Sequence, residues 1–532
     1  MRFTRAGLVL LSVVSGLLMA FSFPLGPPLP LPNIDGWWPA AWVCLAPLML
    51  AASRARSTRP AAGLGLISGM TSFGMILCWM GPFLARWARL SLAEAAGVSS
   101  LLILYVASYV AVFAACLEIL SRRFGAAGAF LLAPAAWTGL ELLRGTILTG
   151  FPWCLLGSSQ QPAPIVTQVA SIAGVYGVSF ALAAFGGAVA WFMDRVAPGP
   201  RQPRRRLIIP AALLSVVAAA AGYGGWTLTR KEPAAPSVPI ALVQANVAQE
   251  DKWEPGESAR IEADHVQMTR QAAAGGARLI VWSESSVPIS ITHHPDYAHR
   301  LAELSDATNA DLLVGTVTYE RHGGSEAPFN SAVLVRPGRG IVGRYDKIHL
   351  VPFGEYVPLK RFLFFLEPLV AEASDFMPGD DITLLGGNTL ALGTVICYEA
   401  IFPGITRKYS RAGATLIVNI TNDSWYGDTA MPRQHLLQAA MRAVESRRWL
   451  LRCASTGISA VVDPAGRIVA RAEFERREIL HATVTLASGT TVYAAIGDVF
   501  AIGCVILTLA SLAMVPFPRP ARAVSPGEMH AR

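Results

Sequence analysis

Three residues that could do chemistry together each follow a run of apolar and β-branched residues. Glu284 follows LIVWS, Lys347 follows IVGRYD, and Cys397 follows LALGTVI. Such runs are typical of buried strands, and strands deliver the side chains at their ends to a common edge of a sheet. A thiol needs a base to become a nucleophile, and the oxyanion that forms when it attacks a carbonyl needs a positive donor. The set therefore predicts acyl chemistry on a cysteine, without histidine.

Each of these residues also has a simpler interpretation when it is taken alone. Glu284 could be an exposed loop acid, Lys347 a surface partner of Asp346, and Cys397 a small buried apolar residue. Only the combination favours a catalytic site. A carboxylate raises the pKa of a nearby thiol and a lysine lowers it, so the sequence leaves the resting form of Cys397 open.

From Val238 onward the chain alternates between short β-type runs and helical stretches. The β-type runs are PIALVQANV, ARLIVWSES, DLLVGTVTY, SAVLVRP, TLALGTVICYE, ATLIVNITND and ISAVVDPAGRIVARAEF. This alternation predicts an α/β fold or a layered α-β-β-α core. The DPAG turn at 463–466 indicates a hairpin. This part, roughly 260 residues long, can bury a complete core by itself.

The rest of the chain is dominated by apolar runs. Of the 532 residues, 53% are hydrophobic and 15% are charged, and the mean hydropathy is +0.43. A soluble protein with an ordinary polar surface is less apolar, so we expect a membrane protein. A helix that crosses a bilayer needs roughly 20 mainly apolar residues. Eight segments qualify: 6–24, 38–53, 62–81, 93–120, 125–143, 164–193, 207–227 and 494–516.

These segments divide the chain into three expected parts. Residues 1–230 form a seven-helix transmembrane domain, residues 231–492 an extracytoplasmic catalytic domain, and residues 493–532 a final transmembrane helix with a cytoplasmic tail. The first segment also resembles a signal peptide, because Arg2 and Arg5 precede its apolar run and the small-residue pattern AFS (20–22) follows it.

The distribution of arginines decides between a signal peptide and a retained first helix. If the N-terminus is cytoplasmic, fifteen arginines lie in the inside segments and three in the opposite short loops, which favours a retained helix and two cytoplasmic termini. The inside arginines are Arg2, Arg5, Arg54, Arg56, Arg59, Arg122, Arg123, Arg195, Arg201, Arg204, Arg205, Arg206, Arg519, Arg522 and Arg532, and the outer ones are Arg86, Arg89 and Arg144.

Several other features are compatible with this organisation. The net charge of +8 does not indicate a nucleic-acid partner, because the arginines form short clusters between apolar runs. The seven cysteines have neither disulfide-framework nor zinc-site spacing, and we interpret Cys453, the second thiol of the catalytic part, as either a structural residue or a spectator thiol. Trp137, Glu141 and Arg144 cluster at the outer end of the fifth span. They form either an interfacial aromatic belt with an ion pair or a functional group of residues.

Four strings of the catalytic part resemble the nitrilase superfamily. They are VWSES (281–285), GRYDKIHLVPFGEYVP (343–358), ICYEAIFP (396–403) and NDSWYG (422–427). Their order, the predicted spans and TGFPW after the fifth span are similar to the apolipoprotein N-acyltransferase family within it. The resemblance implies a nitrilase-like α-β-β-α sandwich outside an eight-span helical membrane domain. Residues 452–457 (RCASTG) depart from the family's pattern, which has asparagine before Thr-Gly.

The resemblance also implies roles for single residues. Glu284 would be the general base, Lys347 the stabiliser of the tetrahedral intermediate and Cys397 the nucleophile. The residues with implied supporting roles are Glu355, Tyr398, Glu399 and Trp253.

The resemblance implies acyl transfer in two steps. An acyl chain would pass from a phospholipid, expected to be phosphatidylethanolamine, to a thioester on Cys397. It would then pass to the α-amino group of an N-terminal S-diacylglyceryl cysteine of an apolipoprotein, on the periplasmic side of a bacterial inner membrane. No metal, nucleotide or other cofactor and no nucleic acid is expected. Segment 361–373 would either cover the site or form a core helix.

Two other functions stay open at this point. A membrane-anchored amidase or nitrilase would use the same three residues on a small amide, although one span would suffice to anchor it. A transport or scaffold protein with an inactive domain would not need the three residues intact.

Overall fold

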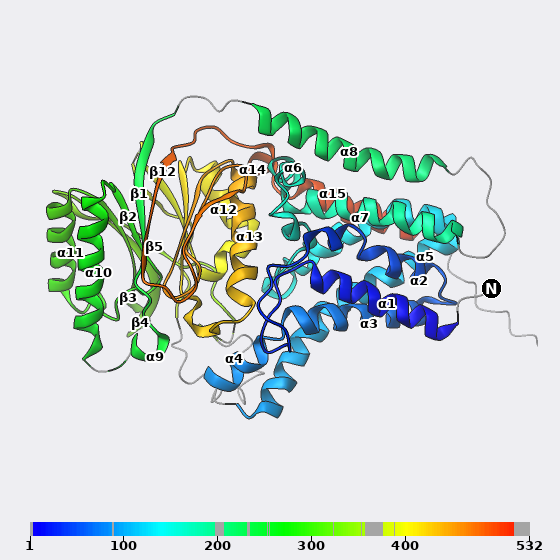
Figure 1. The fold of residues 1–532 in the computed structure, drawn as a ribbon, viewed down its shortest axis with the longest axis horizontal. Coiled ribbons are helices and arrows are strands. Elements are labelled where there is room, and N and C mark those ends of the chain that lie inside the picture. The colour runs from blue at the N-terminus through cyan, green and yellow to red at the C-terminus, as the bar shows by residue number, and fades with distance from the viewer. Residues whose placement is uncertain are drawn as a thin grey trace, which may run out of the picture.

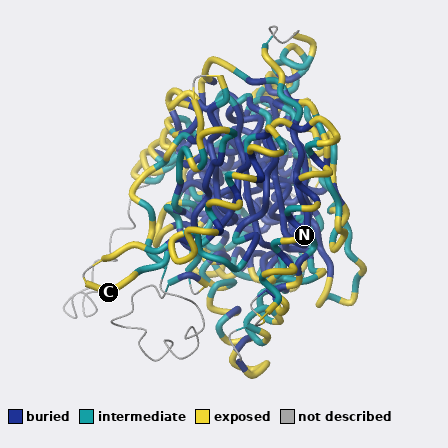
Figure 2. The backbone as a smooth tube through the Cα atoms, turned by 90° about the vertical axis from the view of Figure 1, so that its left-hand side faces the viewer, coloured by how far each residue is buried: buried dark blue, intermediate teal, exposed yellow. Residues whose placement is uncertain are grey.

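Two β-sheets lie at one end of the molecule and a bundle of apolar helices lies at the other (Figure 1). The computed structural model describes residues 4–87, 90–196, 207–230, 235–252, 254, 256–322, 324–352, 354–356, 376–387 and 389–514. Each sheet has six strands, and the two sheets contact each other through β1 with β9, β2 with β9 and β4 with β7. The apolar inner faces of the sheets form the core that appears as buried chain in Figure 2.

The first sheet has the order β12-β1-β2-β3-β4-β5. Strands β1, β2 and β3 are parallel, and the others are added antiparallel. Helices α10 and α11 cover its outer face (Figure 1). The bounds are β1 Ser237–Gln244, α9 Gln249–Lys252, α10 Glu257–Ala274, β2 Leu279–Trp282, α11 Pro295–Thr308, β3 Asp311–His322, β4 Ser325–Arg336, β5 Gly340–Asp346 and β12 Glu478–Thr485.

The second sheet has the order β11-β10-β9-β8-β7-β6, with β7, β8 and β9 parallel. Helices α12 and α13 pack on its outer face, so the layers run α-β-β-α as the sequence predicts. Strands β7 and β8 are buried along their whole length, which fits their continuous apolar runs. The bounds are β6 Leu384–Gly386, β7 Ala391–Ile396, η6 Cys397–Ile401, α12 Pro403–Arg411, β8 Leu416–Thr421, η7 Asp423–Tyr426, α13 Met431–Ser446, β9 Leu450–Ala454, β10 Ala460–Val462 and β11 Ile468–Arg471.

The predicted hairpin at 463–466 joins β10 and β11, which pair antiparallel. Gly466 has φ 85°, a conformation that glycine adopts without steric cost, and its amide donates to the Asp463 carbonyl. The hairpin also contacts the helical part, because Gln161 Nε2 donates to the Gly466 carbonyl at 2.8 Å.

Each of the eight predicted apolar segments overlaps a helix. By length and composition, three of the described helices can cross a membrane, or four if the bent pair α3 and α4 counts as one span. Eight spans therefore remains a prediction. The helices are α1 Arg5–Phe21, η1 Trp38–Trp42, α2 Leu45–Ser53, α3 Thr58–Ile76, α4 Met80–Trp87, α5 Leu92–Arg144, η2 Ile147–Thr149, η3 Leu156–Gln160, α6 Pro164–Thr167, α7 Ala170–Val196, α8 Ile208–Thr229, α14 Val492–Ile496 and α15 Val499–Ala513.

Helix α5 contains a break that separates two predicted spans. Its 53 residues would extend ~80 Å if they were straight, whereas the apolar layer of a bilayer is ~30 Å thick. Gly125 has φ 70° and ψ 165°, outside the helical region. The break falls at the first residue of the predicted segment 125–143, so the length of α5 is compatible with two crossings.

Candidate active site

Glu284 lies two residues after β2 and is only 7% exposed. Its carboxylate accepts two hydrogen bonds, from Asn330 Nδ2 to Oε1 at 2.7 Å and from the Asn422 backbone amide to Oε2 at 2.8 Å. The exposed-acid interpretation is therefore wrong. The two donors hold Glu284 in one orientation between the ends of strands from both sheets.

Lys347 follows β5 directly and is 1% exposed. Its Nζ lies 2.9 Å from Glu355 and 3.6 Å from Glu284 Oε1. Asp346 instead pairs with Arg344, at 2.7 Å, so Lys347 is not its surface partner. Burial alone would lower the pKa of Lys347, but the carboxylates of Glu355 and Glu284 outweigh it and raise that pKa. Lys347 is therefore a buried, charged ammonium.

Cys397 begins the short helix η6 immediately after β7 and is 9% exposed. Its φ of 50° lies in the left-handed region, which costs a non-glycine residue roughly 1 kcal/mol or more. Burial and the charge of Glu284 raise the pKa of the thiol well above its usual value, and Lys347 opposes them only in part. The direction of this shift favours the neutral thiol as the resting group. A base must take its proton during attack.

Glu399 joins the turn that carries the thiol to the loop that carries the lysine. Its carboxylate accepts from the backbone amides of Ile396 at 2.7 Å, Ile348 at 2.8 Å and His349 at 3.1 Å, and from the Tyr345 hydroxyl at 2.8 Å. Burial raises the pKa of Glu399 to about 7, and these donors offset part of the effect. A residue of the second sheet thus fixes the backbone next to Lys347.

The structure places the other predicted supporting residues as follows. Glu355 is 9% exposed and accepts from Lys347 Nζ, from Asn330 Nδ2 at 2.9 Å and from the Val351 amide at 2.8 Å. Tyr398 is 8% exposed and its ring packs edge-on against Phe402. Trp253 and segment 361–373 lie outside the described residues.

Two asparagines of the site were not predicted. Asn330, on β4, donates to both Glu284 and Glu355, so one amide group spaces two carboxylates that face the same lysine. Asn422 follows β8 and contributes its backbone amide. An asparagine within the apolar strand run FNSAVLV is a signal that could have pointed to Asn330.

Helix α13 brings the helical part against the site. The side-chain oxygen of Gln434 accepts from the indoles of Trp79 at 3.1 Å and Trp153 at 2.8 Å, and its Nε2 donates to the carbonyls of Pro24 at 2.8 Å and Ile76 at 3.0 Å. All four of these hydrogen bonds join the side chain to the apolar-helix part. The helices are therefore packed into the catalytic part by specific polar contacts, which a mere anchor would not need.

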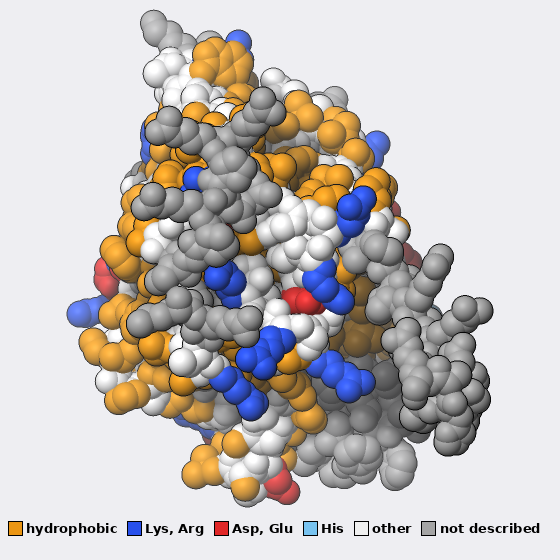
Figure 3. Space-filling view, turned by 90° about the vertical axis from the view of Figure 1, so that its right-hand side faces the viewer, with side chains coloured by type: hydrophobic (Ala, Val, Ile, Leu, Met, Phe, Trp, Pro, Cys, Tyr) orange, Lys and Arg blue, Asp and Glu red, His pale blue; other side chains and the backbone are white. Residues whose placement is uncertain are grey.

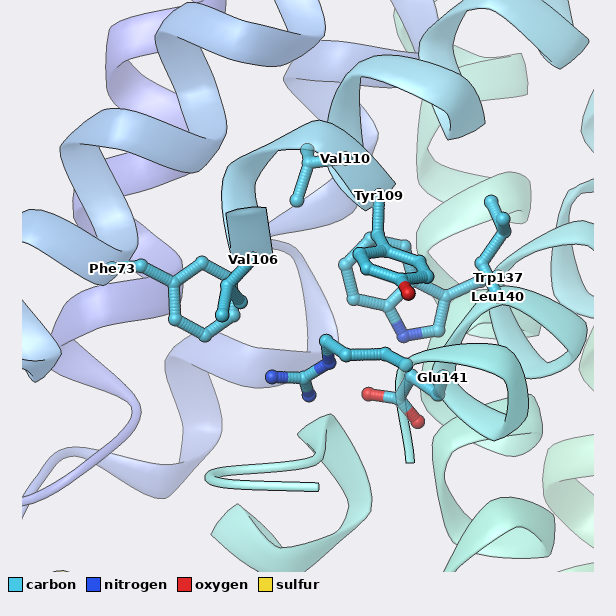
Figure 4. A pocket seen from close by; sticks show the side chains of 8 residues that line it. Phe73, Val106, Tyr109, Val110, Trp137, Leu140 and Glu141 are labelled. Atoms are coloured by element: carbon cyan, nitrogen blue, oxygen red, sulfur yellow. The ribbon is translucent and has the colours of Figure 1, made fainter. Parts of the chain in front are cut away.

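Trp137, Glu141 and Arg144 line a small pocket of α5 beside α3, together with Phe73 (Figure 4). Trp137 is 6% exposed, so it does not belong to an interfacial belt. Glu141 Oε1 accepts from the Leu156 amide at 2.7 Å, and Arg144 donates to the Trp153 carbonyl at 2.9 Å. The charged pair thus holds the loop that carries Trp153 against α13.

One group of side chains in the site has the residue types of a metal site. The Cys397 sulfur and one ligand atom each of Asp423 and His435 lie within 4.8 Å of one another. However, Arg452 Nη2 lies 2.6 Å from Asp423 Oδ2 and 3.2 Å from His435 Nδ1. A guanidinium already occupies the place of the cation, so this donor set does not fit a metal ion.

Comparison with known proteins agrees with this architecture. Residues 239–493 match the carbon-nitrogen hydrolase family model, and residues 15–188 match the model of the apolipoprotein N-acyltransferase N-terminal domain. The apolipoprotein N-acyltransferase of Geobacter metallireducens is 38% identical over 93% of both chains. That of Methylococcus capsulatus is 33% identical over 93% of this chain and 94% of its own. The chain belongs to the apolipoprotein N-acyltransferase family. With its long apolar helices, it is a membrane protein of that family.

Proposed function

We propose that the protein transfers an acyl chain from a phospholipid to the α-amino group of an N-terminal S-diacylglyceryl cysteine in an apolipoprotein, through a thioester on Cys397. The observation that carries the proposal is the meeting of Cys397, from the second sheet, with Glu284 and Lys347, from the first, beside a helix that is hydrogen-bonded to the membrane part. The family's name is consistent with this reaction.

In the first half-reaction, Glu284 takes the proton of the Cys397 thiol while the sulfur attacks the ester carbonyl of the phospholipid. The ammonium of Lys347 and the backbone amide of Tyr398 stabilise the oxyanion. The bond between the carbonyl carbon and the glycerol oxygen breaks, and that oxygen takes the proton from Glu284. A lysophospholipid leaves and a thioester remains.

In the second half-reaction, the α-amine of the apolipoprotein attacks the thioester carbonyl and Glu284 takes a proton from the amine. The carbon–sulfur bond breaks, and the sulfur regains the proton. The products are an amide and the free thiol. Because one lipid leaves before the other reacts, a single lipid site can serve both substrates in a ping-pong order.

The same proposal includes a location for each part. The chain would span a bacterial inner membrane eight times, with residues 1–230 and 493–532 forming the membrane domain and tail and residues 231–492 lying on the periplasmic side. Figure 3 displays Lys and Arg side chains over the end of the helical part that faces away from the sheets, which supports a cytoplasmic position for that end. The test fuses, after residue 300, a reporter enzyme that works only in the cytoplasm. Activity of this fusion would contradict the proposed orientation.

The test uses the purified protein in vesicles that contain phosphatidylethanolamine as the acyl donor. With vesicles alone, we expect a burst of lysophospholipid equal to the amount of enzyme and a long-chain acyl adduct on Cys397 in the mass spectrum. A diacylated lipopeptide with a free α-amine should discharge the adduct, and the same lipopeptide with an acetylated amine should not. Phosphatidylglycerol vesicles test the expected head-group preference.

The outcomes separate the candidate functions. A membrane-anchored amidase would hydrolyse a short amide and carry no lipid adduct. If product formed only when both substrates were present, with no acyl-enzyme at any time, transfer through Cys397 would be replaced by direct transfer.

A further inference from the structure

A buried polar network that the proposed mechanism does not use lies beneath the nucleophile. Asp423, His435 and Arg452 each have 0% exposed side chains, although they come from η7, α13 and β9. Arg452 donates to Asp423 Oδ2 at 2.6 Å and to Asn419 Oδ1 at 2.5 Å. Thr421 donates to Asp423 Oδ1 at 3.0 Å. Burying an ion pair is costly, so a network this well connected calls for a role.

The contacts of His435 show that its ring nitrogen Nε2 carries a proton. His435 Nε2 lies 3.1 Å from the carbonyl oxygen of Cys397, and a carbonyl only accepts, so Nε2 is the donor. On the other side of the ring, Nδ1 lies 3.2 Å from Arg452 Nη2, which only donates, and 3.3 Å from Asp423 Oδ1, which only accepts. Nε2 carries a proton whether Nδ1 accepts from Arg452 or donates to Asp423 in the charged ring. Burial and the charge of Arg452 lower the pKa of His435, and Asp423 and the Cys397 carbonyl oppose them only in part.

The Cys397 carbonyl accepts this hydrogen bond and a longer one from Asn419 Nδ2, at 3.5 Å. Its direction sets that of the adjacent peptide unit. The carbonyl and the next amide of a trans peptide point in opposite directions. With the Cys397 carbonyl held against His435, the Tyr398 amide faces the opposite side. As the second amide of the short helix η6, it has no acceptor within that helix. The same hydrogen bond also restrains Cys397 in its strained left-handed conformation, at φ 50°.

We propose that His435 is a positioning residue for the nucleophile. Its Nε2–H holds the Cys397 carbonyl, which fixes the left-handed turn and aims the Tyr398 amide at the oxyanion of the tetrahedral intermediate. Asp423 and Arg452 both face Nδ1 and hold the ring in the orientation that points Nε2–H at this carbonyl. The inference rests on the proposed acyl-enzyme function and adds to it a group outside the Glu284, Lys347 and Cys397 set.

Two matched substitutions test this role. His435→Gln keeps an amide donor at about the reach of Nε2, whereas His435→Asn places its amide near the position of Nδ1, too short to reach the carbonyl. We expect His435→Gln to form the acyl-enzyme within about tenfold of the wild-type rate. His435→Asn should form the acyl-enzyme about 10- to 100-fold more slowly than wild type. This effect is smaller than the loss of a whole oxyanion donor, which typically slows the reaction about 100- to 1000-fold.

Burst kinetics separate positioning from a merely structural role. The amplitude of the lysophospholipid burst counts folded, competent sites, and its rate measures the chemistry. A positioning role slows the burst of His435→Asn and leaves its amplitude and the pH dependence of the rate unchanged. A lowered amplitude with the wild-type rate, or His435→Gln as slow as His435→Asn, would overturn the inference.

A second probe separates the failure of this inference from the failure of the proposed function. A p-nitrophenyl ester of a short fatty acid acylates a reactive cysteine without a lipid or lipoprotein site, and the released nitrophenolate gives its own burst. If wild type reacts with the ester but never with phospholipid, the proposed function fails, and the two variants still test His435. Equal ester burst rates for wild type and His435→Asn would overturn the positioning role.

Discussion

The two sheets of the catalytic part hold their reactive groups by different means. The first sheet holds Glu284 and Lys347 in a network of side chains, in which Asn330 and Glu355 fix the distances between charges. The second sheet holds Cys397 through its backbone, with a left-handed φ and a carbonyl bound from α13. Charge and geometry are therefore set separately. The charges of Glu284 and Lys347 can be changed by substitutions of similar shape. The position of the Cys397 thiol depends instead on the backbone conformation around residue 397.

The largest expected effect comes from removing the nucleophile, which follows a strand of the second sheet. Cys397→Ala should abolish the lysophospholipid burst completely, because no other described thiol lies beside Glu284 and Lys347. The thermal unfolding midpoint should stay within a few degrees of wild type, since the backbone contacts of residue 397 remain. Any acyl adduct on the variant would contradict a single nucleophile.

The next largest effect is expected from Glu284→Gln, which removes the charge of a first-sheet side chain and keeps its shape. Glu284→Gln keeps an oxygen that can accept from the Asn422 amide but cannot take the thiol proton. Loss of a general base typically costs about 100- to 10,000-fold, so we expect a burst slower by that factor. Its amplitude should be unchanged. A burst at the wild-type rate would require another base for Cys397.

The same contrast explains which features could be predicted from the sequence. Strands β2 and β7, which end near Glu284 and Cys397, are continuous buried runs that can be recognised in the sequence alone. Strand β5, before Lys347, is mostly half-buried and gives a weaker signal. Strand β9 was not predicted because Arg452 interrupts its apolar pattern, and the partner of that arginine, Asp423, lies 29 residues earlier in the chain. Strand β12 was missed as well, because its half-exposed pattern EILHATVT becomes a strand only by pairing with β1.

The polar contacts that complete the site depend on tertiary structure in the same way. The contact of Gln434 with Trp79 joins residues 355 positions apart, and no local pattern encodes it. Trp153 was visible in the TGFPW string, but its bond to α13 was not. The sequence therefore predicts the chemical groups well and the scaffold that aims them poorly.

A third and smaller effect concerns a second buried cation on the first-sheet side. Lys252 is 1% exposed, and its Nζ lies 3.4 Å from the carbonyl oxygen of Glu284. Burial lowers the pKa of Lys252 to about 8, although the charge of Glu284 opposes this. An unfolded lysine has a pKa of about 10.4. Between these values the unfolded chain binds more protons than the folded one, so stability rises with pH across that window.

Lys252→Met should remove this rise. Below pH 8 the burial cost is fully present in wild type, so the variant should unfold at a temperature higher by a few degrees relative to wild type. That advantage should disappear as the pH approaches 10. Thermal scans of both proteins at matched detergent and salt measure the difference, and parallel curves over the whole range would show that Lys252 is not desolvated in this way.

The smallest expected effect separates the two thiols of the second sheet. Cys453 lies on β9, is 0% exposed, and its thiol donates to the carbonyls of Val243 at 3.4 Å and Val281 at 3.2 Å, both on the first sheet. Burial raises its pKa to about 12, so it is a neutral group packed between the sheets. Cys453→Ala should change the burst rate by less than about twofold and reduce stability by about 1 kcal/mol, within the usual range for a single core substitution.

Burst rate and unfolding midpoint, measured together, should show opposite patterns for the two variants. Cys453→Ala should lose some stability and keep its burst rate. Cys397→Ala should lose its burst and keep its unfolding midpoint. If Cys453→Ala were as inactive as Cys397→Ala at an unchanged unfolding midpoint, contact between the sheets would itself be part of the catalytic apparatus, and the separation of charge from geometry would no longer hold.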